Sequence, residues 1–142
     1  MFASWVTWAL LSAVFAALTA IFAKIGVQDV DSDLATLLRT CVVVIALGAL
    51  VIGLGKWSNP TQLSSKTLVF LVLSGLATAA SWLCYFRALQ IGPVALVAPI
   101  DKFSVVLVAV FAFAALGERL SLREWIGVGL ITSGIVLIAL RR

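Results

Sequence analysis

Apolar residues occur along the chain in five long runs, each separated from the next by a short polar stretch. The runs cover residues 5–25, 34–54, 67–89, 93–116 and 122–140. A helix needs about 20 predominantly apolar residues to cross a bilayer core, and each run comes near that length. A spanning barrel would instead need short segments of alternating polarity. The sequence therefore predicts an all-α integral membrane protein with five transmembrane helices, forming a single domain over residues 1–142.

The stretches between the runs contain the residues that end or begin helices. Residues 28–33 are too acidic to remain in lipid, and residues 56–66 combine turn formers with two lysines. Gly92 and Pro93 interrupt the chain before the fourth run. Ser121, with Glu124 three residues later, matches a capping box at the start of the fifth helix. Every connection is shorter than a folded module, so we expect the protein to act in or across the membrane.

The overall composition excludes several kinds of chemistry. The chain is 63% hydrophobic and only 11% charged, which is far too apolar for a water-soluble domain of 142 residues. It has no histidine, the commonest ligand for zinc, copper or haem and the usual acid–base group near neutral pH. Cys41 and Cys84 lie inside apolar runs, where a thiol behaves as a small hydrophobe. We expect no enzyme activity, no metal site and no cofactor.

The net charge of +4 does not indicate nucleic acid, because the basic residues are scattered and form no basic face. With five helices, one side of the membrane receives four basic residues and the other receives five. The first group is Lys56, Lys66, Arg119 and Arg123, and the second is Lys24, Arg39, Arg87, Arg141 and Arg142. Such a near tie has two interpretations. Either the charges nearest the hydrocarbon decide a single orientation, or copies insert both ways and pair antiparallel.

The strongest candidate for function lies inside the fourth run, where Asp101 and Lys102 follow Pro99. Proline frees a backbone carbonyl, which at membrane depth is tolerated only against protein or a wet cavity. Asp101 could cap the lower half-helix, pair with a basic residue on another helix, or carry a proton. The structural alternative, equally favoured, is a neutralising ion pair with Lys24, Lys102 or Arg39 as the cation.

Two further groups of residues are candidates for a binding site. Lys24 and Arg39 lie near helix ends, where their long side chains could also snorkel to the interface, and we favour that interpretation. In the third run, polar residues recur at spacings of four, three and four, which places them on one helical face next to Trp82. They are Ser74, Thr78, Ser81 and Tyr85. This face could line a cavity, although close helix packing explains it equally well.

Five short stretches of the chain form a recognisable series: Ala20-Ile21-Phe22-Ala23-Lys24-Ile25-Gly26, Leu38-Arg39, Tyr85-Phe86-Arg87-Ala88-Leu89, Ala98-Pro99-Ile100 and Gly117-Glu118-Arg119-Leu120. Taken in order, they resemble the EamA-like branch of the drug/metabolite transporter superfamily. Many members of this branch carry two five-helix units in inverted orientation around a substrate cavity. This sequence has one unit, so the resemblance implies that two copies pair.

The related small multidrug resistance proteins use a glutamate in the first helix for proton coupling, and this chain has no carboxylate there. That mechanism therefore cannot simply be carried over, and Asp101 is the only substitute carboxylate at depth. From the resemblance and the candidate residues we expect a secondary transporter or facilitator of a small metabolite or drug-like solute. It would work by alternating access as an antiparallel homodimer in a bacterial inner membrane. Its partners would be lipids, the solute and a second copy, with no nucleic acid. The alternative is a non-transporting membrane subunit or scaffold whose intramembrane ion pairs are structural.

Overall fold

The computed structural model describes residues 4–140, apart from the side chain of residue 61, and its backbone is helical almost throughout. The helices are α1 (Trp5–Gly26), α2 (Ser32–Gly53), the short 3-10 helix η1 (Pro60–Gln62), α3 (Ser65–Ile91), α4 (Val94–Asp101), α5 (Phe103–Ala115) and α6 (Leu122–Ala139). No strand occurs in this part of the chain. Five segments are long and apolar enough to cross a membrane, and the fourth combines α4 and α5 as Val94–Ala115. The prediction of an all-α membrane fold is confirmed.

Polar residues at the helix starts explain where α1 and α2 begin. The Ser4 hydroxyl accepts a hydrogen bond from the Val6 N–H at 3.3 Å. The Asp31 carboxylate accepts two, from Asp33 N–H at 2.9 Å and Leu34 N–H at 3.1 Å. Such caps satisfy N–H groups that have no partner within the helix. The acidic stretch after α1 therefore starts the second helix as well as separating the two.

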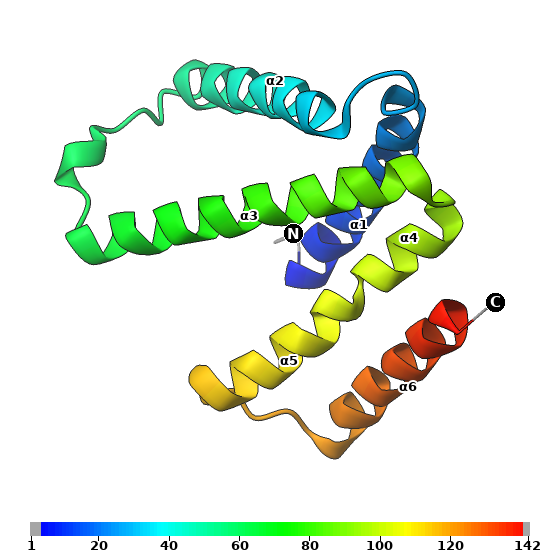
Figure 1. Cartoon of the computed structure of the whole chain (residues 1–142). Coiled ribbons are helices and arrows are strands. Elements are labelled where there is room, and N and C mark those ends of the chain that lie inside the picture. The colour runs from blue at the N-terminus through cyan, green and yellow to red at the C-terminus, as the bar shows by residue number, and fades with distance from the viewer. Residues whose placement is uncertain (1–3, 141–142) are drawn as a thin grey trace. The chain divides into compact units, whose positions relative to one another are not determined.

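The chain divides into two compact units at Ile91 and Gly92. In the first unit, α3 packs against both α1 and α2 (Figure 1). Its buried residues gather where α1 ends, α2 begins and α3 ends: Ala20, Ala23, Val27, Ser32, Thr36, Phe86 and Leu89. The Thr36 hydroxyl donates to the Ser32 carbonyl at 2.8 Å, so it is not left unsatisfied. This unit is therefore best packed at one end.

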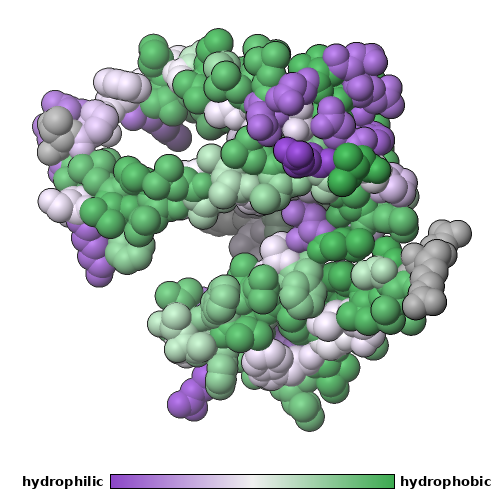
Figure 2. Space-filling view, viewed as in Figure 1, coloured by the Kyte–Doolittle hydropathy of each residue, from purple (hydrophilic) through white to green (hydrophobic). Residues whose placement is uncertain are grey.

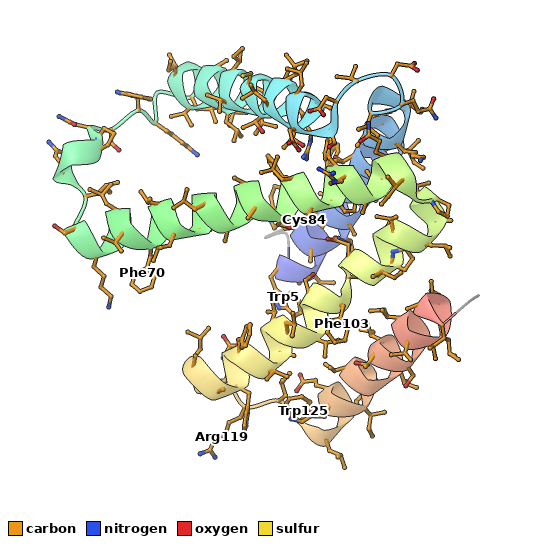
Figure 3. The ribbon with its side chains drawn as sticks, in the orientation of Figure 1. Trp5, Phe70, Cys84, Phe103, Arg119 and Trp125 are labelled. Carbon is orange, nitrogen blue, oxygen red and sulfur yellow. The ribbon has the colours of Figure 1, made fainter. Side chains whose placement is uncertain are left out.

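In the second unit, α6 packs against α4 and α5. Ser121 and Glu124 form the expected capping box at the start of α6, with the Ser121 N–H donating to the Glu124 carboxylate at 2.6 Å. Gly117, at a φ of +69°, ends α5 in a conformation that favours glycine. Trp125 meets Phe113 edge to face, with ring centroids 6.0 Å apart. Figure 3 shows Trp125 on α6 and Arg119 in the α5–α6 connection, pointing away from the helices.

Most large apolar side chains are exposed in both units, and only six hydrophobic residues of the described chain are buried. Figure 2 shows apolar residues over most of the visible surface, with hydrophilic residues gathered at helix ends such as the α1–α2 connection. A soluble protein could not expose so much contiguous apolar surface. The surface is therefore suited to lipid or to another membrane subunit.

Candidate functional site

The first unit contains a pocket of about 360 Å³ near the end where its core is densest. Side chains from α1, α2, α3 and the α1–α2 connection form its wall. They are Thr19, Phe22, Ala23, Gly26, Val30, Ala35, Leu38, Arg39 and Phe86. This volume is at the lower end of the range typical of small-molecule sites. Seven of these residues are apolar and two, Thr19 and Arg39, are polar, so the pocket is an apolar site with one positive charge.

Arg39 is the charged residue of this pocket, and aromatic rings of α3 hold its guanidinium. The Arg39 Cζ atom lies 4.1 Å from the centroid of the Trp82 ring and 5.4 Å from that of Phe86. Arginine stacks favourably on aromatic faces through its charge and its planar shape. Trp82 lies nine residues before the end of α3, about 13 Å along the helix axis. The guanidinium is therefore held beside α3 well before that helix ends.

Two long-range hydrogen bonds connect the helix ends around the pocket. The Lys24 ammonium donates to the Leu89 carbonyl, which joins the last turn of α1 to the last turn of α3. The Gln90 amide donates to the Val30 carbonyl at 3.1 Å, which joins α3 to the α1–α2 connection. Lys24 thus satisfies a carbonyl that a helix C-terminus leaves without an intrahelical donor. These two bonds hold the ends of α1, α2 and α3 together, and Lys24 itself does not line the pocket.

The predicted polar face of α3 does not line this pocket. Ser74, Thr78 and Ser81 are exposed and do not line it, and the Thr78 hydroxyl donates back to the Ser74 carbonyl at 2.8 Å. Tyr85 is half-buried and close enough to Arg39 for an electrostatic interaction. The structure therefore brings together Arg39, Trp82 and Tyr85 from the predicted set.

In the second unit, the fourth span is interrupted at Lys102, between α4 and α5. Pro99 lies inside α4 and has no N–H to donate to the Ala95 carbonyl. At the interruption the Lys102 N–H donates to the Pro99 carbonyl, and the Val105 N–H to the Lys102 carbonyl, at 3.0 and 2.9 Å. Both bonds span only three residues, as in a 3-10 turn. The single apolar run of residues 93–116 is thus two helices.

Asp101 and Lys102 form an ion pair at this interruption, with the Lys102 Nζ atom 3.1 Å from an Asp101 oxygen. The side chains are 57% exposed for Lys102 and 34% exposed for Asp101. No side chain caps α5, so among the predicted roles of Asp101 the half-helix cap is not realised. The pair stands within a span, where a charge is costly unless protein or water covers it.

Sequence reasoning missed most of the pocket wall. Thr19, Ala23 and Gly26 follow one another at spacings of four and three, which places them on one face of α1. That spacing was a usable signal, because two of the three residues are too small to fill the space beside them. Phe22, Val30, Ala35 and Leu38 carry no signal beyond hydrophobicity. Cys41 and Cys84 are free, and residues 4–140 contain no group of three potential metal ligands.

Comparison of the sequence with known proteins places this chain in a family. The model of the EamA-like transporter family matches residues 3–140. An uncharacterized transporter in the cobO 3' region of Sinorhizobium sp is 54% identical over 136 residues, which cover 96% of each chain. The probable 4-amino-4-deoxy-L-arabinose-phosphoundecaprenol flippase subunit ArnE of Yersinia pestis (strain Pestoides F) is 32% identical over 58% of this chain and 74% of its own length.

No solved structure matches the chain. The matched relatives are bacterial transporters, which is consistent with a multi-pass protein of a bacterial inner membrane. The family match covers all five spans. It therefore includes the residues that line the pocket of the first unit and those of the interrupted span in the second. This chain therefore belongs to the EamA-like transporter family.

Proposed function

We propose that this transporter chain carries a small solute across the membrane by alternating access, as one single-domain half of an antiparallel homodimer. The observation that carries the proposal is the Asp101–Lys102 ion pair at the interruption of the fourth span. The midpoint of Val94–Ala115 lies between residues 104 and 105, so Lys102 is about 4 Å from the centre of the span. Interrupted helices with polar groups near the bilayer centre are typical of secondary transporters.

Pairing of two copies is supported by the charge distribution and by the exposed surface. The basic residues divide almost equally between the two sides, so neither orientation is strongly favoured. Nearly all large apolar side chains of the described chain are exposed, which leaves ample surface for contact with a second copy of the chain. The similarity to a flippase subunit adds that a related protein of comparable size works as part of an assembly.

In this proposal Asp101 is the residue that couples movement of the solute to movement of an ion, and Lys102 partly neutralises its charge. Pro99 weakens α4 just before the interruption, because it has no N–H to donate to the preceding turn. The remaining predicted site residues would line the solute path or position it: Lys24, Arg39, Ser74, Thr78, Ser81, Trp82 and Tyr85.

The alternative is a membrane subunit or scaffold in which the ion pair only neutralises two charges within the span. Its specific support is that Asp101 and Lys102 are sequence neighbours in direct contact, 3.1 Å apart. A local pair of this kind needs no solute. The two functions differ in whether water reaches the interruption, because a transport pathway must admit water from each side in turn and a packed scaffold need not.

Cysteine accessibility tests this difference without a known substrate. Ser104→Cys, three residues after Asp101, is placed in a Cys41→Ser, Cys84→Ser background and reconstituted into sealed liposomes. An impermeant methanethiosulfonate reagent is then added outside, or trapped inside. The matched control restores the native Cys41, which lies near the centre of the apolar α2.

We expect the cysteine at position 104 to be labelled from both sides and Cys41 from neither. Labelling of position 104 no faster than that of Cys41 would contradict the transport pathway. Asp101→Asn, in protein that remains folded, should then change the labelling rate from the two sides. An unchanged rate would remove Asp101 from the coupling role.

A further inference from the structure

The pocket of the first unit has a chemistry that restricts what it can hold. Its wall is apolar except for the Thr19 hydroxyl and the Arg39 guanidinium. A cationic solute would be repelled by Arg39, and a strongly polar one would lose hydration without replacing it. A small apolar molecule that bears one negative group satisfies both parts of the wall.

The stacking of Arg39 leaves its hydrogen-bonding edge available. The Arg39 Cζ atom lies over the Trp82 ring, 4.1 Å from its centroid, and the guanidinium carries five N–H bonds in its own plane. Within residues 4–140, no acceptor takes a hydrogen bond from this group and no carboxylate lies within 4 Å of it. A planar fork of donors held against an aromatic ring is suited to bidentate binding of a carboxylate.

The positions of Arg39 and Thr19 along their helices favour a small solute over a lipid headgroup. Arg39 lies seven residues after the start of α2, about 10 Å along the axis, and Thr19 lies equally far from the end of α1. The residues nearer the helix ends, such as Gly26 and Ala35, are apolar. Arg39 and Thr19 therefore lie about two turns inside helices long enough to span the membrane, farther from the helix ends than the apolar residues Gly26 and Ala35.

We propose that this pocket binds a small organic acid, with its carboxylate on the Arg39 edge and its apolar body against Phe22, Leu38 and Phe86. The proposal names the solute class for the proposed transport function and rests on that function for movement of the ligand, but not for its binding. Trp82 acts as a positioning residue, because it holds the guanidinium plane and does not itself line the pocket.

Equilibrium dialysis of the whole chain in dodecyl maltoside micelles tests the proposal, with labelled 4-phenylbutyrate as the probe. Three compounds separate the contributions: 4-phenylbutylamine reverses the charge, 4-phenylbutanol removes it, and acetate removes the apolar body. We expect saturable binding of 4-phenylbutyrate, with the amine, alcohol and acetate each at least about tenfold weaker. Binding of the amine or of acetate as tight as that of 4-phenylbutyrate would overturn the proposal.

Substitutions in and outside the pocket test whether 4-phenylbutyrate binds at Arg39. Arg39→Gln should weaken 4-phenylbutyrate binding at least about tenfold. Arg87→Gln is the matched control, since Arg87 is exposed on α3 and does not line the pocket. Gly26→Leu leaves Arg39 intact and adds a side chain where a Cβ meets open space, so it should also weaken binding. Equal affinities in Arg39→Gln and Arg87→Gln, or an unchanged affinity in folded Gly26→Leu, would overturn the assignment.

The two proposals fail separately. Loss of 4-phenylbutyrate selectivity with two-sided labelling of position 104 would remove the organic-acid site and leave the transport pathway. Specific binding at Arg39 without labelling of position 104 would keep the site and contradict the pathway.

Discussion

Removing one partner of the Asp101–Lys102 ion pair should destabilise the protein more than removing both. At the observed separation of 3.1 Å, Coulomb attraction is about 1.3 kcal/mol in water and about 5 kcal/mol at an effective dielectric constant near 20. Both side chains are at least one-third exposed in the described chain, so solvent reduces the larger figure. We expect a coupling energy of about 1 to 3 kcal/mol, above the usual value for a surface pair.

The measurement is a double-mutant cycle with Asp101→Asn, Lys102→Gln and the double variant. Each protein is unfolded in dodecyl maltoside by titration with sodium dodecyl sulfate, and helicity is followed by circular dichroism. Asp101→Asn leaves an unpaired ammonium near the centre of a span, whereas the double variant leaves no charge there. The double variant should therefore be more stable than the sum of the single effects predicts. Additivity within about 0.5 kcal/mol would refute the reasoning.

Three further perturbations test other parts of the structure by the same unfolding assay. Ser121→Ala removes the capping box with Glu124 and should cost about 1 kcal/mol, and no loss would contradict the role of the cap. Trp82→Ala removes the ring that stacks on Arg39 and should cost at least about 1 kcal/mol, with Trp82→Phe milder, whereas equal losses would argue against the stacking. Pro99→Ala restores a donor for the Ala95 carbonyl and should raise stability, so lower stability would show that the interruption has another cause.

The five spans could be predicted from sequence because hydropathy directly reflects the cost of placing residues in lipid. The ends were less predictable. The second span begins at Ser32 rather than residue 34, because Asp31 caps a first turn that is itself polar. The third extends to Ser65 and Ile91, beyond the apolar run of residues 67–89. A polar helix end has no hydropathy signal and is fixed by hydrogen bonding instead.

The interruption of the fourth span was predictable in kind and not in position. Pro99 indicated a weak point, yet the helix continues through it to Asp101 and breaks at Lys102. Proline removes a hydrogen bond to the preceding turn, and where the chain then bends depends on the turns that follow. The contact of Asp101 with Lys102, among several possible cations, also required coordinates.

The pocket depends on tertiary structure. Arg39 and Trp82 are 43 positions apart, and their stacking depends on how α2 and α3 are aligned along their length. Sequence reasoning identified both residues as candidates and had no basis for pairing them. It could have found one wall, since Thr19, Ala23 and Gly26 share a face of α1.

The central claim, that two oppositely oriented copies form the pathway, is tested most directly by mapping topology in intact cells. Asp29→Cys and Asn59→Cys lie in the connections at opposite ends of α2, and each is placed alone in a Cys41→Ser, Cys84→Ser background. An impermeant thiol reagent is added outside the cells, and total cysteine is counted after lysis. The account predicts that each site is labelled in about half of the molecules. Complete labelling of one site and complete protection of the other would contradict it.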